Sequence, residues 1–320
     1  SLLAGTAWGP LEAHPYLLDP SPWTRFLLLV AIFTLAERSV DLRLDDIVER
    51  FTDSPLVARR DMPEMAARLA EALRRRDSRV AELVTAAIAL GLGVFTLVNT
   101  TSPEGGAWYA RPATEGGGAT VAGIWAALVS VTVFAFLVLR WLRALVIWGL
   151  LLRRVAGLEL RLSLFHPDGY GGLGFLGRYP NVFALHVFAI SCVLGAALMR
   201  QVLAGTAEPT VFVAVMGSWL AVVMALFGLP LLAFFPPLSA LKKTAMEAAS
   251  ALATHHGRED ERKVLGDNCA APGAADEVDG APDPGKLYAA ARKLGTLPFA
   301  RAALVPIGAA ALLPLAAAGA

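Results

Sequence analysis

Six stretches of mostly apolar residues recur along the chain, and they limit its fold more than any other feature. They are Trp23–Ala36, Ala81–Val98, Val121–Leu139, Val182–Leu198, Val211–Phe235 and Phe299–Leu315. A helix of about 20 such residues crosses the roughly 30 Å hydrocarbon core of a bilayer. The sequence therefore predicts an all-α polytopic membrane bundle of about six spans, with residues 1–320 as a single transmembrane domain.

Both ends of the chain also lie in apolar sequence. Ser1 is followed by Leu-Leu-Ala-Gly-Thr-Ala, and the last stretch, Arg301–Ala320, stops while still apolar. We therefore expect the chain to be trimmed at both ends, and seven spans are the alternative for the full chain.

The composition fits the same class of protein. Apolar residues make up 56% of the chain and charged residues 17%, whereas a soluble domain has about 25% charged residues. The formal net charge of +1 argues against a nucleic-acid partner, which requires a basic face. The spacing of the two cysteines, Cys192 and Cys269, suggests neither a disulfide nor a zinc framework. The sequence predicts no cofactor and no bound metal.

Lysine and arginine are concentrated in alternate loops, which sets the expected orientation. Arg38–Arg79, Arg140–Arg178 and Lys242–Arg301 are basic, whereas Thr100–Thr120 and Arg200–Thr210 carry few such residues. Basic loops stay on the cytoplasmic side. The three basic segments are therefore predicted to face the cytoplasm.

Several cytoplasmic segments can be distinguished by their pattern. Residues 38–79 are predicted to form an amphipathic, helical loop, and the third span is expected to continue past Leu139 to Leu152 as a helical extension. Residues 257–286 mix charges with Ala, Gly, Pro and Asp, and this composition cannot build a packed core. We therefore predict a flexible cytoplasmic linker there.

Small residues recur every four positions in three of the spans. These positions are Gly217, Ala221 and Ala225, then Ala89 and Gly93, then Ser191 and Gly195. Such faces let helix backbones approach closely within a membrane. We expect them to pack within one subunit, with packing between subunits as the alternative.

Residues 157–178 combine an alternating run with a glycine-rich turn. Leucines at every second position from Leu158 to Leu164 predict a short strand with one apolar face, placed at the cytoplasmic surface. His166-Pro167-Asp168-Gly169 then predicts a turn. The candidate ion or proton site in this segment comprises His166, Asp168, Gly169, Gly171, Gly172, Gly174 and Gly177.

Four interpretations of that segment remain open. His166 and Asp168 can form a proton-handling pair, because histidine titrates near neutral pH. Two ligands at this spacing indicate a metal only weakly, and the glycines lack the other residues of a phosphate-binding loop. The remaining interpretation is structural: Asp168 caps the next helix and the glycines permit a tight return of the chain.

Three ionisable residues inside or beside the spans are further candidates. Arg140 and Arg143 share a helix face near the predicted cytoplasmic boundary, where they either anchor to lipid headgroups or line the inner mouth of an ion pathway. His186 falls inside a span, and an ionisable group there suggests function. A neutral, hydrogen-bonded core histidine is the alternative.

The glycine-rich segment resembles the signature of a family of uncharacterised bacterial multi-pass inner-membrane proteins. The resemblance is carried by His166-Pro-Asp-x-x-Gly-Gly-Leu-Gly-Phe-Leu-Gly177 and by four shorter segments. These are Leu35-Ala-Glu-Arg, Arg76-Asp-Ser, Leu139-Arg-Trp-Leu-Arg143 and Leu297-Pro-Phe. The resemblance covers most of the chain and implies a helical, multi-pass protein of the bacterial inner membrane. It implies no activity.

Three functions fit these observations. The first is a homo-oligomeric channel or transporter for a small ion or solute. The second is a membrane scaffold or sensor that binds a protein partner at the cytoplasmic face, through Arg38–Arg79 and strand addition at Leu158–Phe165. The third is a lipid-modifying enzyme that uses His166 and Asp168. No Ser/His/Asp order and no carboxylate pair within a span supports catalysis, so a non-enzymatic role is favoured.

Overall fold

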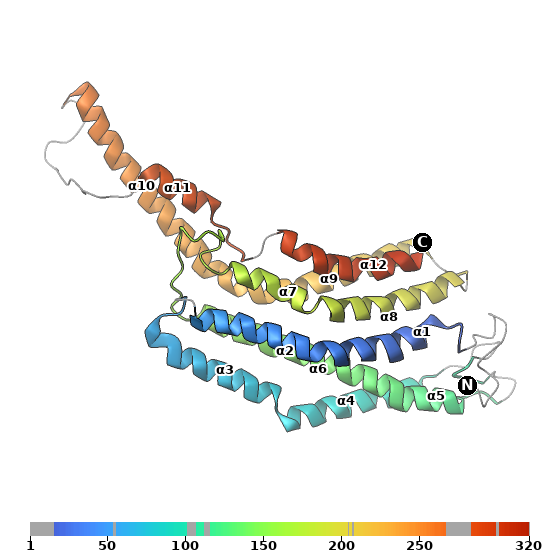
Figure 1. The fold of residues 1–320 in the computed structure, drawn as a ribbon. Coiled ribbons are helices and arrows are strands. Elements are labelled where there is room, and N and C mark those ends of the chain that lie inside the picture. Colours follow the sequence, from blue (N-terminus) through green and yellow to red (C-terminus); the bar gives the residue numbers. More distant parts are fainter. Residues whose placement is uncertain are drawn as a thin grey trace.

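The computed structural model describes residues 16–53, 56–100, 107–111, 116–203, 205–206, 208–266, 283–298 and 301–319. Within these residues the chain is almost entirely helical, and its β-contacts are isolated bridges. Figure 1 shows the long helices lying side by side along one axis. The predicted all-α class is therefore confirmed for the described part of the chain.

The helices form three long continuous runs and several separate elements. The continuous runs are α1 (Pro20–Pro22), η2 (Trp23–Leu28) and α2 (Leu29–Asp53); α5 (Val121–Trp125), η5 (Ala126–Val131) and α6 (Thr132–Ala156); and α9 (Pro209–Leu231), η7 (Leu232–Phe234) and α10 (Phe235–Leu265). The others are η3 (Arg59–Asp61), α3 (Met62–Arg76), α4 (Arg79–Val98), η6 (Gly174–Arg178), α7 (Tyr179–Val182), α8 (Ala184–Leu203), α11 (Pro284–Lys293) and α12 (Arg301–Gly319).

Four helices are long and apolar enough to cross a membrane. They are Arg79–Val98, Val121–Ala156, Ala184–Leu203 and Pro209–Arg258, with mean hydropathies of 2.0, 2.4, 1.6 and 2.3. A shorter apolar helix covers Leu304–Gly319. Large apolar side chains such as Leu83 and Phe95 on α4 are exposed, as expected for a surface that faces lipid. These are the features of a helical membrane protein.

Aromatic packing fixes the short helix α7 against α9 at the centre of the molecule. Tyr179, Phe183 and Phe227 are almost completely buried. The Phe227 ring centroid lies 5.7 Å from that of Tyr179 and 5.8 Å from that of Phe183. This contact sets the position from which α8 begins.

Two of the three faces of small residues pack inside the chain. A Cβ atom added at Gly93 would lie 2.5 Å from Thr132 Oγ1, and one added at Gly195 would lie 2.8 Å from the Pro314 carbonyl oxygen. The glycines therefore allow close α4–α6 and α8–α12 contacts. Gly217 has no such neighbour within 4 Å and is exposed, so the third face points away from the bundle.

The strand predicted at Leu158–Phe165 does not form. Leu160 makes one isolated antiparallel bridge with Val57, and two main-chain hydrogen bonds join this stretch to residues 56–58. The side chains nevertheless alternate between half-buried and exposed, as the leucine pattern requires. The stretch is extended, but it meets too short a neighbouring segment to build a ladder.

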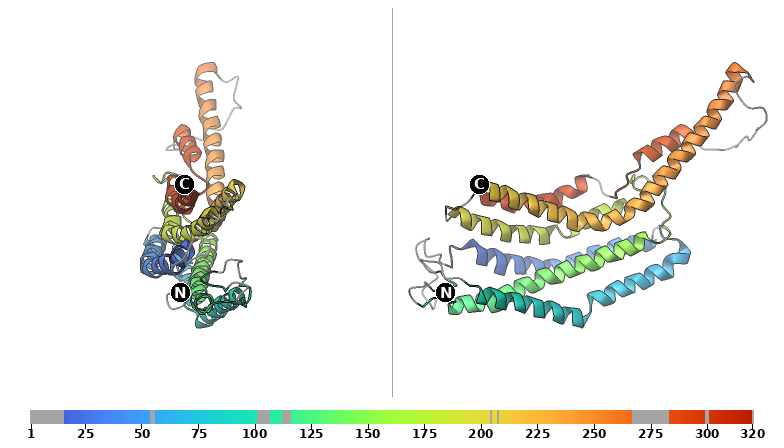
Figure 2. Two further views of the ribbon diagram at one scale, coloured as in Figure 1. Left: turned by 90° about the vertical axis from the view of Figure 1, so that its right-hand side faces the viewer. Right: turned by 180° about the vertical axis from the view of Figure 1, so that it is seen from behind.

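The helix α10 projects beyond the other helices, and α11 lies beside it (Figures 1 and 2). α10 continues to Leu265, so the first part of the linker predicted at 257–286 is helical. Glu and Arg residues there are good helix formers, which outweighs the disorder suggested by the mixed charge. Residues 267–282 lie outside the described residues, and α11 begins at Pro284.

Candidate functional site

A cavity surrounded by charged side chains lies where α2, α6 and α8 meet the corner between α3 and α4. The cavity has a volume of about 390 Å³. In Figure 1, α3 and α4 meet at a corner that bows away from α2 and α6. We call this the inner cavity. It is lined by Phe33, Glu37, Val40, Asp41, Arg76, Asp77, Arg79, Glu82, Leu137, Arg140, Trp141, Arg143, Ala144, Ile147, Phe183 and His186.

The corner follows from capping signals in the sequence. α3 ends at Arg76, and Ser78 begins α4 by accepting a hydrogen bond from the Ala81 main-chain N–H at 3.4 Å. Polar sequence in α3 gives way to apolar sequence in α4 at this point. The corner therefore carries Arg76, Asp77 and Arg79 to the boundary between the polar and apolar parts of the molecule.

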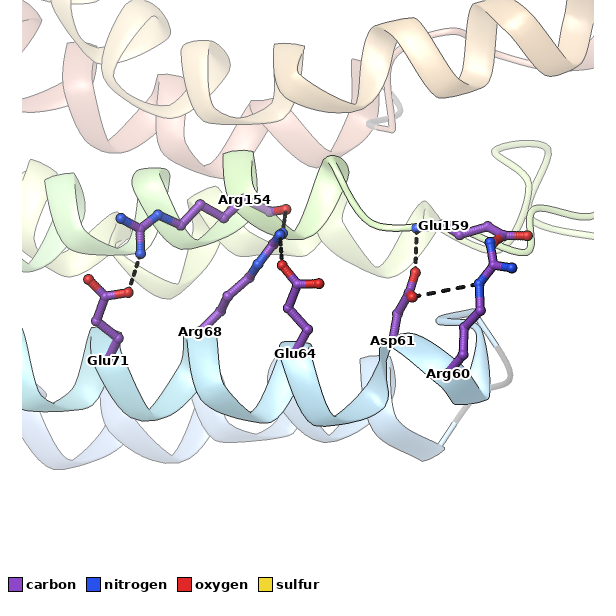
Figure 3. Close-up of polar contacts among 7 residues, drawn as sticks. All are labelled: Arg60, Asp61, Glu64, Arg68, Glu71, Arg154 and Glu159. Carbon is purple, nitrogen blue, oxygen red and sulfur yellow. Dashed lines mark hydrogen bonds and ion pairs between the residues drawn. The ribbon is translucent and has the colours of Figure 1, made fainter.

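Polar contacts hold α3 against the end of α6 (Figure 3). Arg154 donates to Glu71 Oε2 at 2.5 Å, and the Arg68 guanidinium donates to the Arg154 main-chain oxygen. The hydrogen bond from Arg154 is the largest of the contributions that lower the pKa of the Glu71 carboxyl. Asp61 accepts from the Glu159 main-chain N–H at 2.9 Å. These contacts set the direction of α3 and thereby the position of the corner.

Ion pairs cross the mouth of the inner cavity. Arg140 on α6 pairs with Glu37 on α2. Arg76 at the corner donates to Asp41 on α2 at 3.2 Å and to its neighbour Asp77 at 3.1 Å. These pairs tie three helices together at the cavity rim.

His186 forms the apolar end of the cavity together with aromatic rings. Its ring stacks on Trp141 with a centroid distance of 5.8 Å and lies 4.5 Å from the Phe33 ring. The His186 and Trp141 residues are 5% and 6% exposed, and within the described part of the chain neither His186 Nδ1 nor Trp141 Nε1 has a hydrogen-bond partner. The same holds for the buried Nε of Arg143. An unpaired buried polar group costs about 1–3 kcal/mol, so these three atoms mark a place suited to a polar ligand.

A second cavity lies at the other end of the same helices, and we call it the outer cavity. Its volume is about 270 Å³. It is lined by Asp19, Ser21, Pro22, Arg25, Phe26, Thr96, Asn99, Thr100, Trp108, Tyr109, Gly123, Ala126, Ala127, Val131 and Arg200. The charged residues in this lining are two arginines and one aspartate.

Asp19 organises the outer cavity. Its carboxylate accepts from the Ser21 main-chain N–H at 2.9 Å and from Trp108 Nε1 at 3.0 Å, and it lies 3.7 Å from Arg200 Nη1. Arg25 also lines the outer cavity, with its guanidinium 5.6 Å from the Phe134 ring centroid and its Nε without a partner among the described residues.

Four helical runs each contribute lining residues to both cavities, from one face of the run. Residues three or four apart share a helix face, and on the first run Phe26, Leu29, Phe33 and Glu37 follow one another in this way. Phe26 lines the outer cavity, while Phe33 and Glu37 line the inner one. Leu29 lies between them and is completely buried.

Small and apolar residues close the space between the cavities on the other runs. On α4, Ala89 and Gly93 lie between Glu82 of the inner cavity and Thr96 of the outer one, and both are buried. On α8, buried Ala189 lies between the levels of His186 and Arg200. The two polar cavities thus lie at different levels of the same helices, with buried apolar and small residues between those levels.

The glycine-rich segment folds around the carboxylate of Asp168. The carboxylate accepts from the main-chain N–H groups of Tyr170 at 2.8 Å, Gly172 at 3.2 Å and Gly174 at 2.7 Å. His166 Nδ1 lies 2.9 Å from Asp168 Oδ1. Partial burial acts to raise the pKa of Asp168, but these hydrogen bonds outweigh it and hold the pKa below its ordinary value of 3.8.

Glycines in this segment permit the turn and the close contacts around it. Gly169, Gly171 and Gly172 have φ angles of 70°, 67° and 100°, which other residues rarely adopt. Gly177 is buried in η6. The Gly169 carbonyl accepts from the Gly295 main-chain N–H at 2.8 Å. The segment therefore connects the end of α6 to the chain that follows α11.

The residues predicted from sequence fall into two separate groups. Arg140, Arg143 and His186 all line the inner cavity, whereas the residues from His166 to Gly177 do not. Sequence reasoning missed the partners of the first group, such as Phe33 and Glu37. Three of the short segments singled out in the sequence, 35–38, 76–78 and 139–143, contribute lining residues, and their common location is the signal that could have found these partners.

Comparison of the chain with models of protein families, with curated proteins and with solved structures gives no match.

Proposed function

We propose that the protein crosses the bilayer six times and transports a small ion or solute. The first helical run, Pro20–Asp53, and α12 lie alongside the four long apolar helices in Figures 1 and 2, which supports the two additional spans. The loop at 157–173 and the projecting part of α10 lie at one end of the bundle. This common location supports a cytoplasmic end rich in arginine and lysine. The resemblance of the segment from His166 to Gly177 is the basis for proposing the inner membrane of a bacterium.

The observation that carries the transport proposal is the pair of cavities on the same four helical runs. A transporter exposes its substrate site to one side of the membrane at a time, and inner and outer cavities separated by a closed section fit this requirement. An open channel instead requires a continuous polar path, which the barrier at Leu29, Ala89 and Ala189 interrupts. The pathway lies within one chain, so assembly into a homo-oligomer is a separate proposal.

Flux in liposomes tests this function. The purified protein, reconstituted into liposomes, should give saturable uptake of at least one member of a panel of inorganic ions, organic anions and zwitterions. Arg143→Gln at the inner cavity should reduce that uptake, whereas Arg153→Gln should not, because exposed Arg153 lies on the same helix outside the cavity. Absence of uptake across the whole panel by folded protein would contradict the proposal.

A second candidate function, binding of a protein partner, is favoured by the projecting end of α10. Val264 and Leu265 near this end are 81% and 59% exposed. We propose this arm as the partner surface in place of strand addition at Leu158–Phe165, where no strand forms. A stoichiometric partner that co-purifies from native membranes and is lost on Val264→Asp and Leu265→Asp substitution would support this function, whereas a chain that purifies alone would oppose it.

A further inference from the structure

We propose that the inner cavity binds an amphipathic anion, meaning one phosphate or carboxylate group attached to an apolar body. This inference rests on the proposed transport function and names the class of its substrate. Three features support it: arginines without a carboxylate partner, unpaired nitrogen atoms in the lining residues, and an apolar wall.

Two of the four cavity arginines are not paired with a carboxylate, and one of them, Arg143, donates through Nη1 to the Arg75 main-chain oxygen at 3.4 Å. Arg76 and Arg140 are committed to carboxylates on α2. Arg79 and Arg143 have no carboxylate within 4.0 Å among the described residues. Glu82 is the cavity carboxylate that has no ion pair with an arginine or lysine among those residues. The unpaired groups therefore carry one net positive charge at this part of the wall, within a lining whose four arginines and four carboxylates balance because Arg76 pairs with both Asp41 and Asp77. A guanidinium group matches the geometry of phosphate and carboxylate oxygens.

The unpaired nitrogen atoms point to the same kind of ligand. Arg143 Nε and Trp141 Nε1 can only donate hydrogen bonds, and His186 Nδ1 can donate in one of its tautomers. An anion supplies several acceptor oxygens to such donors. Each of these atoms exposes less than 1 Å², so a small rotation of its side chain has to precede a hydrogen bond to such an anion.

The rest of the cavity is suited to an apolar group. Phe33, Leu137 and Ile147 contribute apolar side chains to its lining beside the ring of Trp141. On α4, Val80 and Leu83 are 72% and 70% exposed next to the cavity residues Arg79 and Glu82. An apolar chain attached to the anionic group can therefore extend onto a surface that faces lipid.

The cavity volume limits the size of the ligand. Ligand pockets in proteins measure about 300–1,000 Å³, and the inner cavity is near the lower end of that range. It holds an anionic headgroup with a short apolar segment, while a longer chain must lie outside. Two sources share this chemistry: a membrane phospholipid that enters from the side, and a free single-chain anion that enters from the cytoplasm.

Binding of dodecyl phosphate to the purified full chain tests the proposal. The dissociation constant should be at least about tenfold lower for dodecyl phosphate than for inorganic phosphate or dodecyl trimethylammonium, because neither control combines both features. Arg143→Gln and Arg79→Gln should each weaken binding by about tenfold or more. Arg153→Gln is the matched control and should bind as the unmodified chain does.

Trp141→Phe keeps the ring but removes the indole N–H donor, and it should weaken dodecyl phosphate binding less than loss of an arginine does. Each variant is compared only after its melting temperature and elution volume match those of the unmodified chain, which excludes misfolding as the cause of weaker binding. Equal affinity of all folded variants for dodecyl phosphate would overturn the proposal. Equal affinity for dodecyl phosphate and inorganic phosphate would overturn it too.

Competition identifies the source of the ligand. Displacement of dodecyl phosphate by phosphatidylglycerol in nanodiscs, but not by phosphatidylcholine, would support the anion site and assign it to a membrane lipid. Retention of dodecyl phosphate in both lipids would support the site and assign it to a free anion. Binding of dodecyl phosphate without any flux in liposomes would support the anion site and refute transport. Flux of an inorganic ion without dodecyl phosphate binding would support transport and refute the anion site.

Discussion

At the scale of single residues, the Asp168 carboxylate shows how a short motif is built by its own main chain. Three N–H groups within the next six residues converge on it. The sequence predicted the turn, and the positive φ angles at Gly169, Gly171 and Gly172 explain why glycine is required there. These contacts provide a structural explanation for the aspartate that involves no substrate.

Substitution of Gly174 tests this explanation. A Cβ atom at Gly174 would lie 2.9 Å from both Cβ and Oδ2 of Asp168, and forced overpacking of this kind costs about 1–3 kcal/mol. We expect Gly174→Ala to lower the melting temperature in detergent. Gly91→Ala is the matched control, because no atom lies within 4 Å of the added Cβ there. Equal melting temperatures for the two variants would show that the contact does not matter.

The pH dependence of the same turn follows from the pKa of Asp168. This pKa is lower in the folded protein than the ordinary value of 3.8, so the carboxylate stabilises the turn fully above that value. The stabilisation is lost as the pH falls through the lower, folded pKa. Hydrogen exchange of the residue 170–174 amides, corrected for intrinsic rates, should therefore stay slow down to about pH 4 and accelerate below it. Asp168→Asn should exchange faster at neutral pH and show no such transition.

Residues of the candidate site could be predicted from the sequence only where a charged or ionisable side chain interrupts an apolar helix. Arg140, Arg143 and His186 are conspicuous because charged or ionisable groups are rare in apolar helices. Phe33 is an ordinary residue of an apolar helix, and Glu37 an ordinary residue just after an apolar run. Their role depends on which helices become neighbours, and a single sequence does not contain that information.

At the scale of elements, the contact between α3 and α6 should depend on Arg68. Its guanidinium donates to the main-chain oxygen of Arg154, and a hydrogen bond of this charged type contributes about 1.5–3 kcal/mol. We expect Arg68→Met to increase hydrogen exchange throughout α3 and to leave α8 unchanged. Arg74→Met is the control, because Arg74 is exposed on the same helix. Identical exchange in the two variants would mean that apolar packing alone holds α3.

The strand prediction failed at this scale for a physical reason. Alternation of leucines predicts which side chains are buried, and the burial of Leu158, Leu160 and Leu162 follows that alternation. A strand also needs a neighbour of similar length, and residues 56–58 provide only two main-chain hydrogen bonds to this stretch. Periodicity therefore gave the direction of the side chains and not the hydrogen-bonded partner.

The exposed face of α9 should determine whether two copies associate. Gly217, Ala221 and Ala225 are exposed at four-residue spacing, and small residues at this spacing allow close helix contact in membranes. We expect Gly217→Leu to convert a dimer to a monomer in detergent, measured by light scattering with the detergent mass subtracted. Val222→Leu, at an exposed position on the same helix but outside this four-residue stripe, should leave the dimer intact. A monomer in the unmodified chain would refute the predicted homo-oligomer.

At the scale of the whole molecule, hydropathy was sufficient to predict the helical class and four of the long apolar helices. The run that includes Trp23–Ala36 is less apolar, because Arg25 lies inside it and Glu37 and Arg38 follow directly. Its place in the bundle is set by tertiary contacts such as the packing of Phe33 against Trp141 and His186. The two cavities could not be predicted, since each combines residues from several helices that lie far apart in the sequence.

The barrier between the cavities gives the last prediction. Leu29 is completely buried and lies on the helix face that joins Phe26 to Phe33. Truncation of a buried leucine leaves a cavity and costs about 2–5 kcal/mol, but in this position it also removes part of the barrier. We expect folded Leu29→Ala protein to increase the passive leak of small ions from liposomes. Leu27→Ala, at a position that is 56% exposed on the same run, should not change the leak. If both variants leak equally little, the two cavities are not connected through this face, and transport must then follow another path.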